Sequence, residues 1–374
     1  MSVTRTTDPD LIGFDPARLA RIDEHFGRYV DDGRLAGWQI VVTRRGEIAH
    51  SRTYGARDAE TGAPVGEDTL WRIYSMTKPV TSVAAMMLWE EGRFELTDEI
   101  SRWLPEFADM RVYSKGSVLK PYTVPAAEPI RVWHLLTHTA GLTYGFMQTS
   151  VVDGLYRAAG YELMPPPGVD LAGACAVFGE FPLLFQPLGM TDTRWWVEEA
   201  DAERLAALYV PDPRTGRAVR HDRFGAVARE KPGLHSGGAG LISSAADYHR
   251  FTQMLLRGGE LDGARLLGPR TVRFMTRNHL PGGHDLATHS VGGFSETIFD
   301  GVGFGLGFAV IDDPVPSRLP SSVGEYYWGG IASTAFWVDP AQELTALLFT
   351  QLMPSSTWPL RTQLRQLVYA ALVD

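Results

Sequence analysis

Strand-forming sequence gathers at both ends of this 374-residue chain and is scarce between them. Residues 15–31 carry apolar side chains at three- and four-residue spacing, which predicts an amphipathic helix. Residues 38–43 and 47–54 then flank Arg44-Arg45-Gly46, a pattern typical of a β-hairpin. The end of the chain repeats this order of elements. It has predicted strands at 303–311, 326–329, 334–338 and 344–352 and a predicted helix at 358–373.

The middle of the chain is predicted to be mainly helical, with Gly- and Pro-rich connections. Its helical patterns lie at 77–91, 129–137, 245–257 and 269–278. We therefore predict an α+β fold, in which both chain termini build one antiparallel sheet flanked by helices and a mostly helical domain is inserted. The predicted sheet domain comprises 1–70 and 300–374, the helical domain comprises 71–299, and a cleft separates them.

Composition excludes several classes of function. The formal net charge of −9 argues against nucleic acid and anionic membranes as partners, since both require clustered positive charge. The single cysteine, Cys175, forms no internal disulfide. No secretory signal or apolar run long enough to cross a bilayer is visible, so we expect a soluble, cytoplasmic protein. The oligomeric state stays open.

Ser75 and Lys78 form the strongest chemical motif. They are three residues apart where the 77–91 helix begins, so their side chains are expected to share a face, with Ser75 as the N-cap. The helix dipole and the apolar residues that follow are expected to lower the pKa of Lys78, which a lysine needs in order to deprotonate serine. Backbone N–H groups at a helix start also supply half of an oxyanion hole.

A structural interpretation competes with this one, because Ser-x-x-Lys occurs often by chance. Ser75 would then be only a cap and Lys78 a solvated residue. The chain itself contains a chance example, since Ser117 and Lys120 have the same spacing but Pro121 follows and forbids a helix. The apolar helix behind Ser75 distinguishes the two motifs.

Residues 74–84, Tyr-Ser-Met-Thr-Lys-Pro-Val-Thr-Ser-Val-Ala, resemble the nucleophile helix of the serine β-lactamase and penicillin-binding-protein superfamily. The chain is most similar to the family VIII carboxylesterases, which are class C β-lactamase-like esterases. Further similar segments follow in the family's order at 129–146, 187–193, 236–248 and 328–330. The resemblance implies that Ser75 is the acylated nucleophile and Lys78 its base or proton relay.

The resemblance also implies a second strand-borne element. Trp328, Gly329 and Gly330 stand where β-lactamases carry Lys-Thr-Gly, and the N–H of Ile331 would complete the oxyanion hole with that of Ser75. A tryptophan in place of lysine removes the cation that receives a β-lactam carboxylate, so small neutral esters are the expected substrates. The resemblance gives Tyr144 a role on the substrate side.

One element of the superfamily is missing. None of the 13 tyrosines is followed two residues later by Asn or Ser, and the single asparagine, Asn278, is preceded by Thr-Arg. Residues 181–187 resemble the stretch that leads into the usual tyrosine segment, and residues 188–193 resemble one that comes well after it. Because the two stretches abut, a helix-bearing segment with the catalytic tyrosine is expected to be deleted here.

Other motifs give weaker signals. His134 and His138 have the spacing of metal ligands, but Leu135 stands where a zincin has Glu, so we interpret them as a structural pair and expect no metal and no cofactor. The Gly-x-Ser-x-Gly elbow of α/β-hydrolases is absent. The glycine-rich stretch 237–240 is expected to be a loop beside the cleft. Residues 195–196 and 326–328 are expected to line an acyl pocket.

The leading hypothesis is a serine hydrolase that cleaves short-chain carboxylic esters through an acyl-enzyme on Ser75. The missing tyrosine motivates an alternative from another class: a catalytically silent or weak β-lactamase-like protein that binds an acyl ligand. A β-lactamase or D,D-peptidase and an acyltransferase are further alternatives within the enzyme class.

Overall fold

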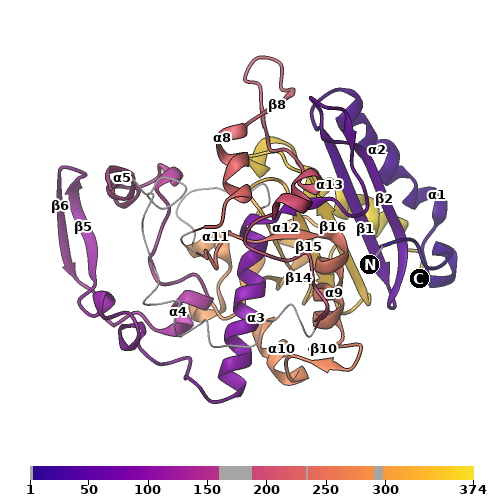
Figure 1. Ribbon diagram of the computed structural model, residues 1–374. Helices are drawn as coiled ribbons and strands as arrows, with labels where there is room; N and C mark the ends of the chain where they lie inside the picture. Colours follow the sequence, from indigo (N-terminus) through magenta and orange to yellow (C-terminus); the bar gives the residue numbers. More distant parts are fainter. Residues whose placement is uncertain (1–2, 160–187, 233–234, 290–297) are drawn as a thin grey trace.

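Both ends of the chain build one antiparallel sheet of eight strands, in the order β12-β13-β14-β15-β16-β1-β2-β3. The computed structural model describes residues 3–159, 188–232, 235–289 and 298–374. Figure 1 shows the two chain ends close together beside this sheet. The predicted α+β architecture is confirmed. The strands are β1 (Gly37–Arg44), β2 (Glu47–Asp58), β3 (Ala63–Pro64), β12 (Val302–Phe304), β13 (Ala309–Ile311), β14 (Tyr326–Gly329), β15 (Ala335–Asp339) and β16 (Leu344–Phe349).

Side chains along the central strands alternate between the two faces of the sheet and so pack into two separate hydrophobic cores. In β1, Trp38, Ile40 and Val42 pack into one core, while Val41 packs into the other. Every residue of β1 is buried, which requires helices on both faces of the sheet. Helices α1 (Pro16–Leu19), α2 (Arg21–Asp31) and α13 (Leu360–Ala371) cover one face, and α9 (Ala245–Leu256) packs on the other.

The helical middle of the chain is organised around α3 (Thr77–Glu90), which follows the short strand β4 (Leu70–Arg72). Strand β4 pairs with β9 (Ile242–Ser244), the strand that leads directly into α9. Helices α3 and α9 therefore begin close together, because the strands that precede them pair with each other. The remaining described helices are α4 (Val132–Leu136), α5 (Val151–Ala158), α8 (Asp222–Gly225), α10 (Pro269–Met275), α11 (Leu286–His289) and α12 (Pro314–Ser317).

Small hairpins decorate the helical part. The longest, β5 (Arg111–Ser117) with β6 (Lys120–Pro125), projects at the left of Figure 1. Ser117 and Lys120 form the turn of this hairpin, so their Ser-x-x-Lys spacing does not lie on a helix, as predicted. The other pairs are β7 (Tyr209–Pro211) with β8 (Ala218–Arg220) and β10 (Glu260–Leu261) with β11 (Ala264–Arg265).

One predicted strand was wrong. The sequence indicated a continuous strand over 303–311, whereas the structure divides it into β12 and β13. Gly305 N–H donates to the Phe308 carbonyl at 2.7 Å, and Gly307 adopts a φ of +91°, so the chain turns back on itself between the strands. The turn is buried, so its residues are as apolar as those of the strands on either side. The hydropathy pattern therefore does not reveal the turn. The domain boundaries at 70/71 and 299/300 stay a prediction.

No helix in the described ranges is both long and apolar enough to cross a membrane. Cys175 and the 181–187 stretch, where the deletion was inferred, lie outside the described residues.

Candidate active site

Ser75 lies in a short 3₁₀ turn, Tyr74–Met76, between β4 and α3. The prediction that Ser75 is the N-cap of the helix was wrong, because Met76 occupies that position and α3 begins at Thr77. The 3₁₀ turn moves Ser75 one position outside the cap. Its hydroxyl is therefore not committed to a helix N–H and bonds a side chain instead, as described below.

The turn is backbone-strained at the residue before Ser75. Tyr74 has a φ of +43°, in the left-handed region that side chains with a Cβ rarely adopt. Such a conformation costs about 1–3 kcal/mol and is found where the surroundings over-determine it, often at functional sites. The Tyr74 side chain is held by a small apolar cluster against which Ile331 also packs. The buried members of this cluster are Leu208, Ala332 and Met353.

Three further hydrogen bonds fix the backbone around Ser75. Ile73 N–H donates to the Leu241 carbonyl at 3.1 Å, and Leu241 N–H donates to Thr77 Oγ1 at 3.1 Å. The buried Tyr248 hydroxyl donates to the Met76 carbonyl at 3.0 Å. These bonds come from the segment around β9 and from α9, so the β4–β9 pairing sets the position of the serine.

The Lys78 ammonium lies beside the Ser75 hydroxyl. Its Nζ donates to Ser75 Oγ at 3.1 Å and to the Gly238 carbonyl at 2.6 Å. Thr81 Oγ1 donates to the Gly237 carbonyl at 2.8 Å, so the glycine-rich loop rests on the first turns of α3. The predicted loop 237–240 thus adjoins this pair. A serine hydroxyl and an amine at this separation have the geometry that proton transfer requires.

The end of strand β14 approaches the same turn. A Cβ placed on Gly330 would lie 2.5 Å from the Ile73 carbonyl oxygen, so the two backbones are in direct contact. Within the described ranges, the N–H groups of Ser75 and Ile331 donate to no backbone carbonyl. Two N–H groups of half-buried residues, neither bonded to a backbone carbonyl in the described ranges and both on backbones held together, match the composition of an oxyanion hole.

Aromatic rings lie at the end of β14, the strand that contacts the turn of Ser75. The Trp328 ring lies 5.7 Å from the His138 ring and 5.2 Å from the Phe304 ring, centroid to centroid. His138 itself has a φ of +58°, a second strained non-glycine residue at the site. The ring of His138 thus joins the site, although the sequence indicated only a structural role for it.

Burial, with a smaller contribution from the charge of Lys78, lowers the pKa of His138 to about 3. His138 is nevertheless an exposed residue. With this pKa, His138 is a neutral imidazole at physiological pH, next to the Lys78 charge.

The Tyr144 ring also lies near Lys78. The Lys78 Nζ is 5.7 Å from the centroid of the Tyr144 ring, and that ring stacks on Phe146 at 5.1 Å. Cation–π attraction acts over this distance. In the described part of the chain, no tyrosine hydroxyl forms a hydrogen bond with Ser75 or Lys78. The site thus contains a tyrosine ring without the hydroxyl contact that the superfamily's missing motif provides.

Part of the predicted acyl pocket was wrong. Tyr326 and Tyr327 are 1% and 5% exposed and point into the two opposite cores of the sheet, because neighbouring residues on a strand face opposite sides. Trp328 remains half-buried at the site. Trp195 stacks on His235 at 5.3 Å and lies against Gly240, next to the glycine-rich loop.

His134 has a structural contact. Its Nδ1 accepts a hydrogen bond from the Arg131 N–H at 3.1 Å, which completes a capping box at the start of α4. Among the residues that the structure describes, no group of three His, Cys, Asp or Glu side chains is arranged to hold a metal ion.

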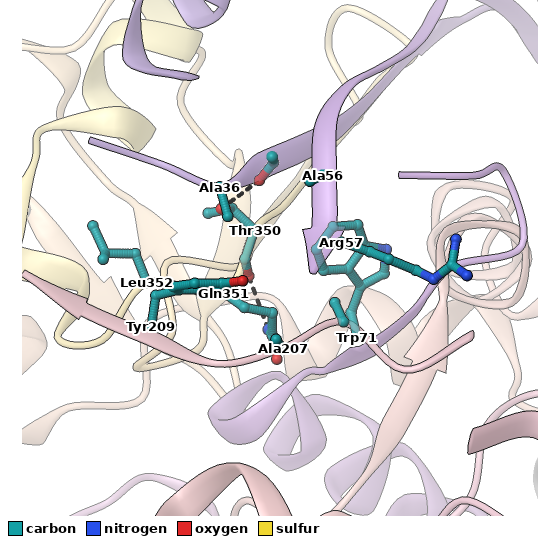
Figure 2. Close-up of a pocket in the computed structure, with 11 residues that line it drawn as sticks. Ala36, Ala56, Arg57, Trp71, Ala207, Tyr209, Thr350, Gln351 and Leu352 are labelled. Atoms are coloured by element: carbon teal, nitrogen blue, oxygen red, sulfur yellow. Dashed lines mark hydrogen bonds between the residues drawn. The ribbon is translucent and has the colours of Figure 1, made fainter. Parts of the chain in front are cut away.

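A small cavity in the described part of the chain does not coincide with this chemistry. Figure 2 shows it beside Trp71, Arg57 and Gln351, with a volume of about 10 Å³, enough for one water molecule. A larger groove of about 410 Å³ lies between α1, α2 and β2 and is lined in part by Asp23 and His50. Neither contains Ser75, Lys78 or Ile331. We identify the candidate site by its side-chain chemistry.

Sequence reasoning missed one residue at this site, Arg361 in the first turn of α13. Its Nη2 donates to the Gly330 carbonyl at 2.7 Å. No sequence signal indicates this contact, since an arginine at the start of a C-terminal helix is ordinary and Gly330 lies 31 positions earlier in the chain.

Comparison with known proteins gives relatives over nearly the whole chain. Residues 22–179 and 182–370 match the family described as Beta-lactamase. Esterase EstB of Burkholderia gladioli is 32% identical, and the match covers 97% of this chain and 98% of EstB. Protein Rv1367c of Mycobacterium tuberculosis (strain ATCC 25618 / H37Rv) is 36% identical, with 87% of this chain and 88% of that protein covered.

The fold has solved counterparts. The structure of EstCE1, titled a hydrolase with promiscuous acyltransferase activity, superposes with a TM-score of 0.73 at 24% identity. The match covers 95% of this chain and 99% of EstCE1. At this identity the likeness shows the fold alone.

Proposed function

The chain belongs to the beta-lactamase family, whose members are serine hydrolases or acyltransferases, and from this premise we propose that it hydrolyses short-chain carboxylic esters through an acyl-enzyme on Ser75. The observation that carries the proposal is the 3.1 Å hydrogen bond between Lys78 Nζ and Ser75 Oγ. The relation to Esterase EstB over almost the full length of both chains supports the same activity.

Acylation follows from this geometry. Acylation starts from the form of the protein in which the Lys78 ammonium has lost a proton to solvent. The resulting amine takes the Ser75 hydroxyl proton while Oγ attacks the ester carbonyl carbon. The N–H groups of Ser75 and Ile331 stabilise the negative charge on the carbonyl oxygen. Collapse of the tetrahedral intermediate breaks the bond to the alcohol oxygen, which receives the proton from Lys78. Ser75 then carries the acyl group.

Deacylation reverses the roles. A water molecule gives a proton to Lys78 and attacks the acyl carbonyl carbon, and Ser75 Oγ leaves with the proton that Lys78 returns. The free acid departs and the enzyme is restored. Lys78 carries both proton transfers in this scheme, because no tyrosine hydroxyl is bonded to the pair in the described part of the chain.

The surroundings favour neutral substrates. Trp328 replaces the lysine that would bind a carboxylate, and its ring contacts the rings of His138 and Phe304. Tyr144 adds an aromatic face on the Lys78 side. We propose that Trp328, Gly329, Gly330 and Tyr144 contact the substrate, with apolar packing of a short acyl or alkyl group as the main attraction.

Acyl transfer to an alcohol is a second candidate, because it uses the same acyl-enzyme and differs only in which hydroxyl attacks it. EstCE1 has both activities according to its title. The N–H groups of Ser75 and Ile331 and the amine of Lys78 serve both reactions equally. Only the competition between water and alcohol separates them.

A partition experiment tests the proposal. The protein is given p-nitrophenyl butyrate in water with and without n-butanol, and butyrate and butyl butyrate are quantified. Butyrate as the main product supports hydrolysis, whereas butyl butyrate as the main product supports acyl transfer. If no nitrophenol is released above the Ser75→Ala rate, the ester-cleaving function is wrong and binding of an acyl ligand without turnover becomes the better account.

A further inference from the structure

We propose that Arg361 is a positioning residue for the oxyanion hole: it holds the Gly330 carbonyl so that the Ile331 N–H of the same peptide unit points at the substrate oxygen. The inference rests on the proposed function, since it assigns Ile331 N–H the role of oxyanion donor. It concerns a residue on the last helix of the chain, remote in sequence from Ser75, Lys78 and the strand-end motif.

Arg361 binds the strand end through one nitrogen. Its Nη2 donates to the Gly330 carbonyl at 2.7 Å and to the Thr334 carbonyl at 3.1 Å. Gly330 N–H donates to the same Thr334 carbonyl at 2.9 Å. The guanidinium therefore braces both sides of the loop that connects β14 to β15.

Peptide planarity carries this contact to the oxyanion hole. The Gly330 carbonyl and the Ile331 N–H belong to one trans peptide unit, in which the C=O and N–H vectors point in opposite directions. A donor that fixes the carbonyl on one side thus fixes the N–H on the other. A cationic donor also polarises the peptide unit and makes its N–H a stronger hydrogen-bond donor.

The local turn holds the same carbonyl from within. Ser333 N–H donates to the Gly330 carbonyl at 3.1 Å, and Ser333 Oγ donates to the Leu352 carbonyl at 2.7 Å. Arg361 adds a second, charged donor that comes from α13. That helix is anchored independently, because Arg365 forms a buried ion pair with Glu325 at 3.0 Å. The loop between β14 and β15 is thereby fixed to α13, one of the helices that cover the sheet.

The two glycines of the strand end fit this arrangement. A Cβ on Gly329 would lie 2.4 Å from Arg361 Cζ, and a Cβ on Gly330 would lie 2.4 Å from Thr334 Oγ1. A Cβ does not approach a non-bonded heavy atom this closely, so neither position accepts a side chain without displacement of its neighbours. The absence of a side chain at Gly329 makes room for the Arg361 guanidinium. This explains a glycine at position 329 without reference to the substrate.

Arg361→Met keeps the aliphatic stem and removes the donors, and Arg361→Lys keeps the charge with less reach. Arg270→Met is the matched control, because Arg270 is an exposed residue in the first turn of α10. We expect Arg361→Met to lower kcat for p-nitrophenyl butyrate about tenfold with little change in KM, since loss of a whole oxyanion donor costs about 10²–10³-fold. Arg361→Lys should recover part of the rate. The control should match the wild type.

A thionoester comparison separates positioning from a general structural effect. An oxyanion hole stabilises developing charge on oxygen better than on the larger sulfur, so the wild type should cleave the ester much faster than its thionoester. A misaligned Ile331 N–H reduces this ratio in Arg361→Met, whereas a merely structural loss lowers both rates equally. An unchanged ratio in a folded Arg361→Met protein would overturn the proposal.

Gly329→Ala provides a second route, because its methyl group displaces the guanidinium without removing it. Its loss and that of Arg361→Met should not add in the double variant, since both break one contact. Additive losses in the double variant would contradict the proposal. If Arg361→Met does not fold, Gly329→Ala alone is the test, and wild-type kinetics of that variant would contradict the proposal.

The rate of Ser75 phosphonylation by a p-nitrophenyl phosphonate is measured in all variants. It needs no hydrolysis, so it distinguishes failure of the Arg361 role (equal labelling rates) from failure of the proposed function (no ester turnover).

Discussion

Lys78 Nζ lies 3.1 Å from Ser75 Oγ, and the same nitrogen is fixed on its other side by the Gly238 carbonyl at 2.6 Å. The ammonium is thus oriented by backbone from a distant loop as well as by its own helix. This arrangement aims one N–H at the serine and leaves little freedom for the lysine to move away.

Lys78→Met removes the group proposed to accept and return the proton while it keeps a side chain of similar length. We expect kcat/KM for p-nitrophenyl butyrate to fall about 10²–10⁴-fold, the usual contribution of a positioned acid–base group. Lys120→Met is the matched control, because Lys120 lies in a Ser-x-x-Lys sequence at the exposed turn of the β5–β6 hairpin. Equal rates for the two variants would contradict the role of Lys78.

Gly330→Ala tests the contact between the strand end and the serine turn. The new methyl group would lie 2.4 Å from Thr334 Oγ1 and 2.5 Å from the Ile73 carbonyl oxygen, so the Ser75 turn and the Ile331 N–H must separate. We expect loss of most ester hydrolysis together with a destabilisation of about 1–3 kcal/mol, typical of overpacking. Activity and urea unfolding measure the two effects.

Gly27→Ala is the contrasting glycine substitution. Gly27 lies inside α2, and an added Cβ would meet only Tyr54 Cε1 at 3.9 Å, an ordinary van der Waals contact. Alanine favours a helix interior over glycine by about 0.5–1 kcal/mol, so the variant should be more stable and fully active. If Gly330→Ala behaved like Gly27→Ala, the close approach at the site would be wrong.

His50 predicts a pH dependence of stability. Burial, with a smaller effect of the Arg52 charge, lowers its pKa to about 4 from 6.5. Between pH 6.5 and 4 the unfolded chain therefore binds a proton that the native state does not bind. Lowering the pH through this window favours unfolding, by up to about 1.4 kcal/mol per pH unit for one group. Above pH 7 the effect vanishes.

His50→Gln isolates this contribution. We expect the free energy of unfolding of the wild type to fall more steeply from pH 7 to pH 5 than that of the variant, as measured by urea titration. Burial raises the pKa of Asp23, which lies 3.3 Å from His50, and of Asp247, and these shifts act in the opposite direction. The Asp247 shift is present in both proteins and cancels in the comparison of slopes, whereas Asp23 contacts the substituted side chain and its shift does not cancel. Parallel slopes would contradict a neutral, buried His50.

Local periodicity was sufficient for most of the fold. The 15–31 helix, the hairpin around Arg45 and the strand at 326–329 follow from residue spacing, because each buries apolar side chains against a neighbour. The structure interrupts the first helix between α1 and α2 at Ala20 and shortens several helices at their ends. The sheet built from both termini followed from the order of elements alone.

The features of the site that the sequence did not predict depend on contacts between residues far apart in the chain. The contact of Arg361 with Gly330 joins positions 31 residues apart, and the approach of Gly330 to Ile73 joins still more distant ones. No periodic pattern encodes such approaches. His138 was interpreted as structural because its neighbours are apolar, whereas its backbone conformation turns the ring toward Trp328. The position of Ser75 in a 3₁₀ turn, and not at the cap, is likewise a tertiary outcome.

The central claim is that Ser75 is acylated. It is tested most directly by measuring the intact mass of the protein after reaction with p-nitrophenyl butyrate and rapid quenching. We predict a butyryl adduct on the wild-type protein, mapped by peptide analysis to residues 74–78. The adduct should be absent in Ser75→Ala and present in Ser117→Ala, whose serine lies in the β5–β6 turn. An adduct that persists in Ser75→Ala, or nitrophenol release at the wild-type rate by that variant, would contradict the account.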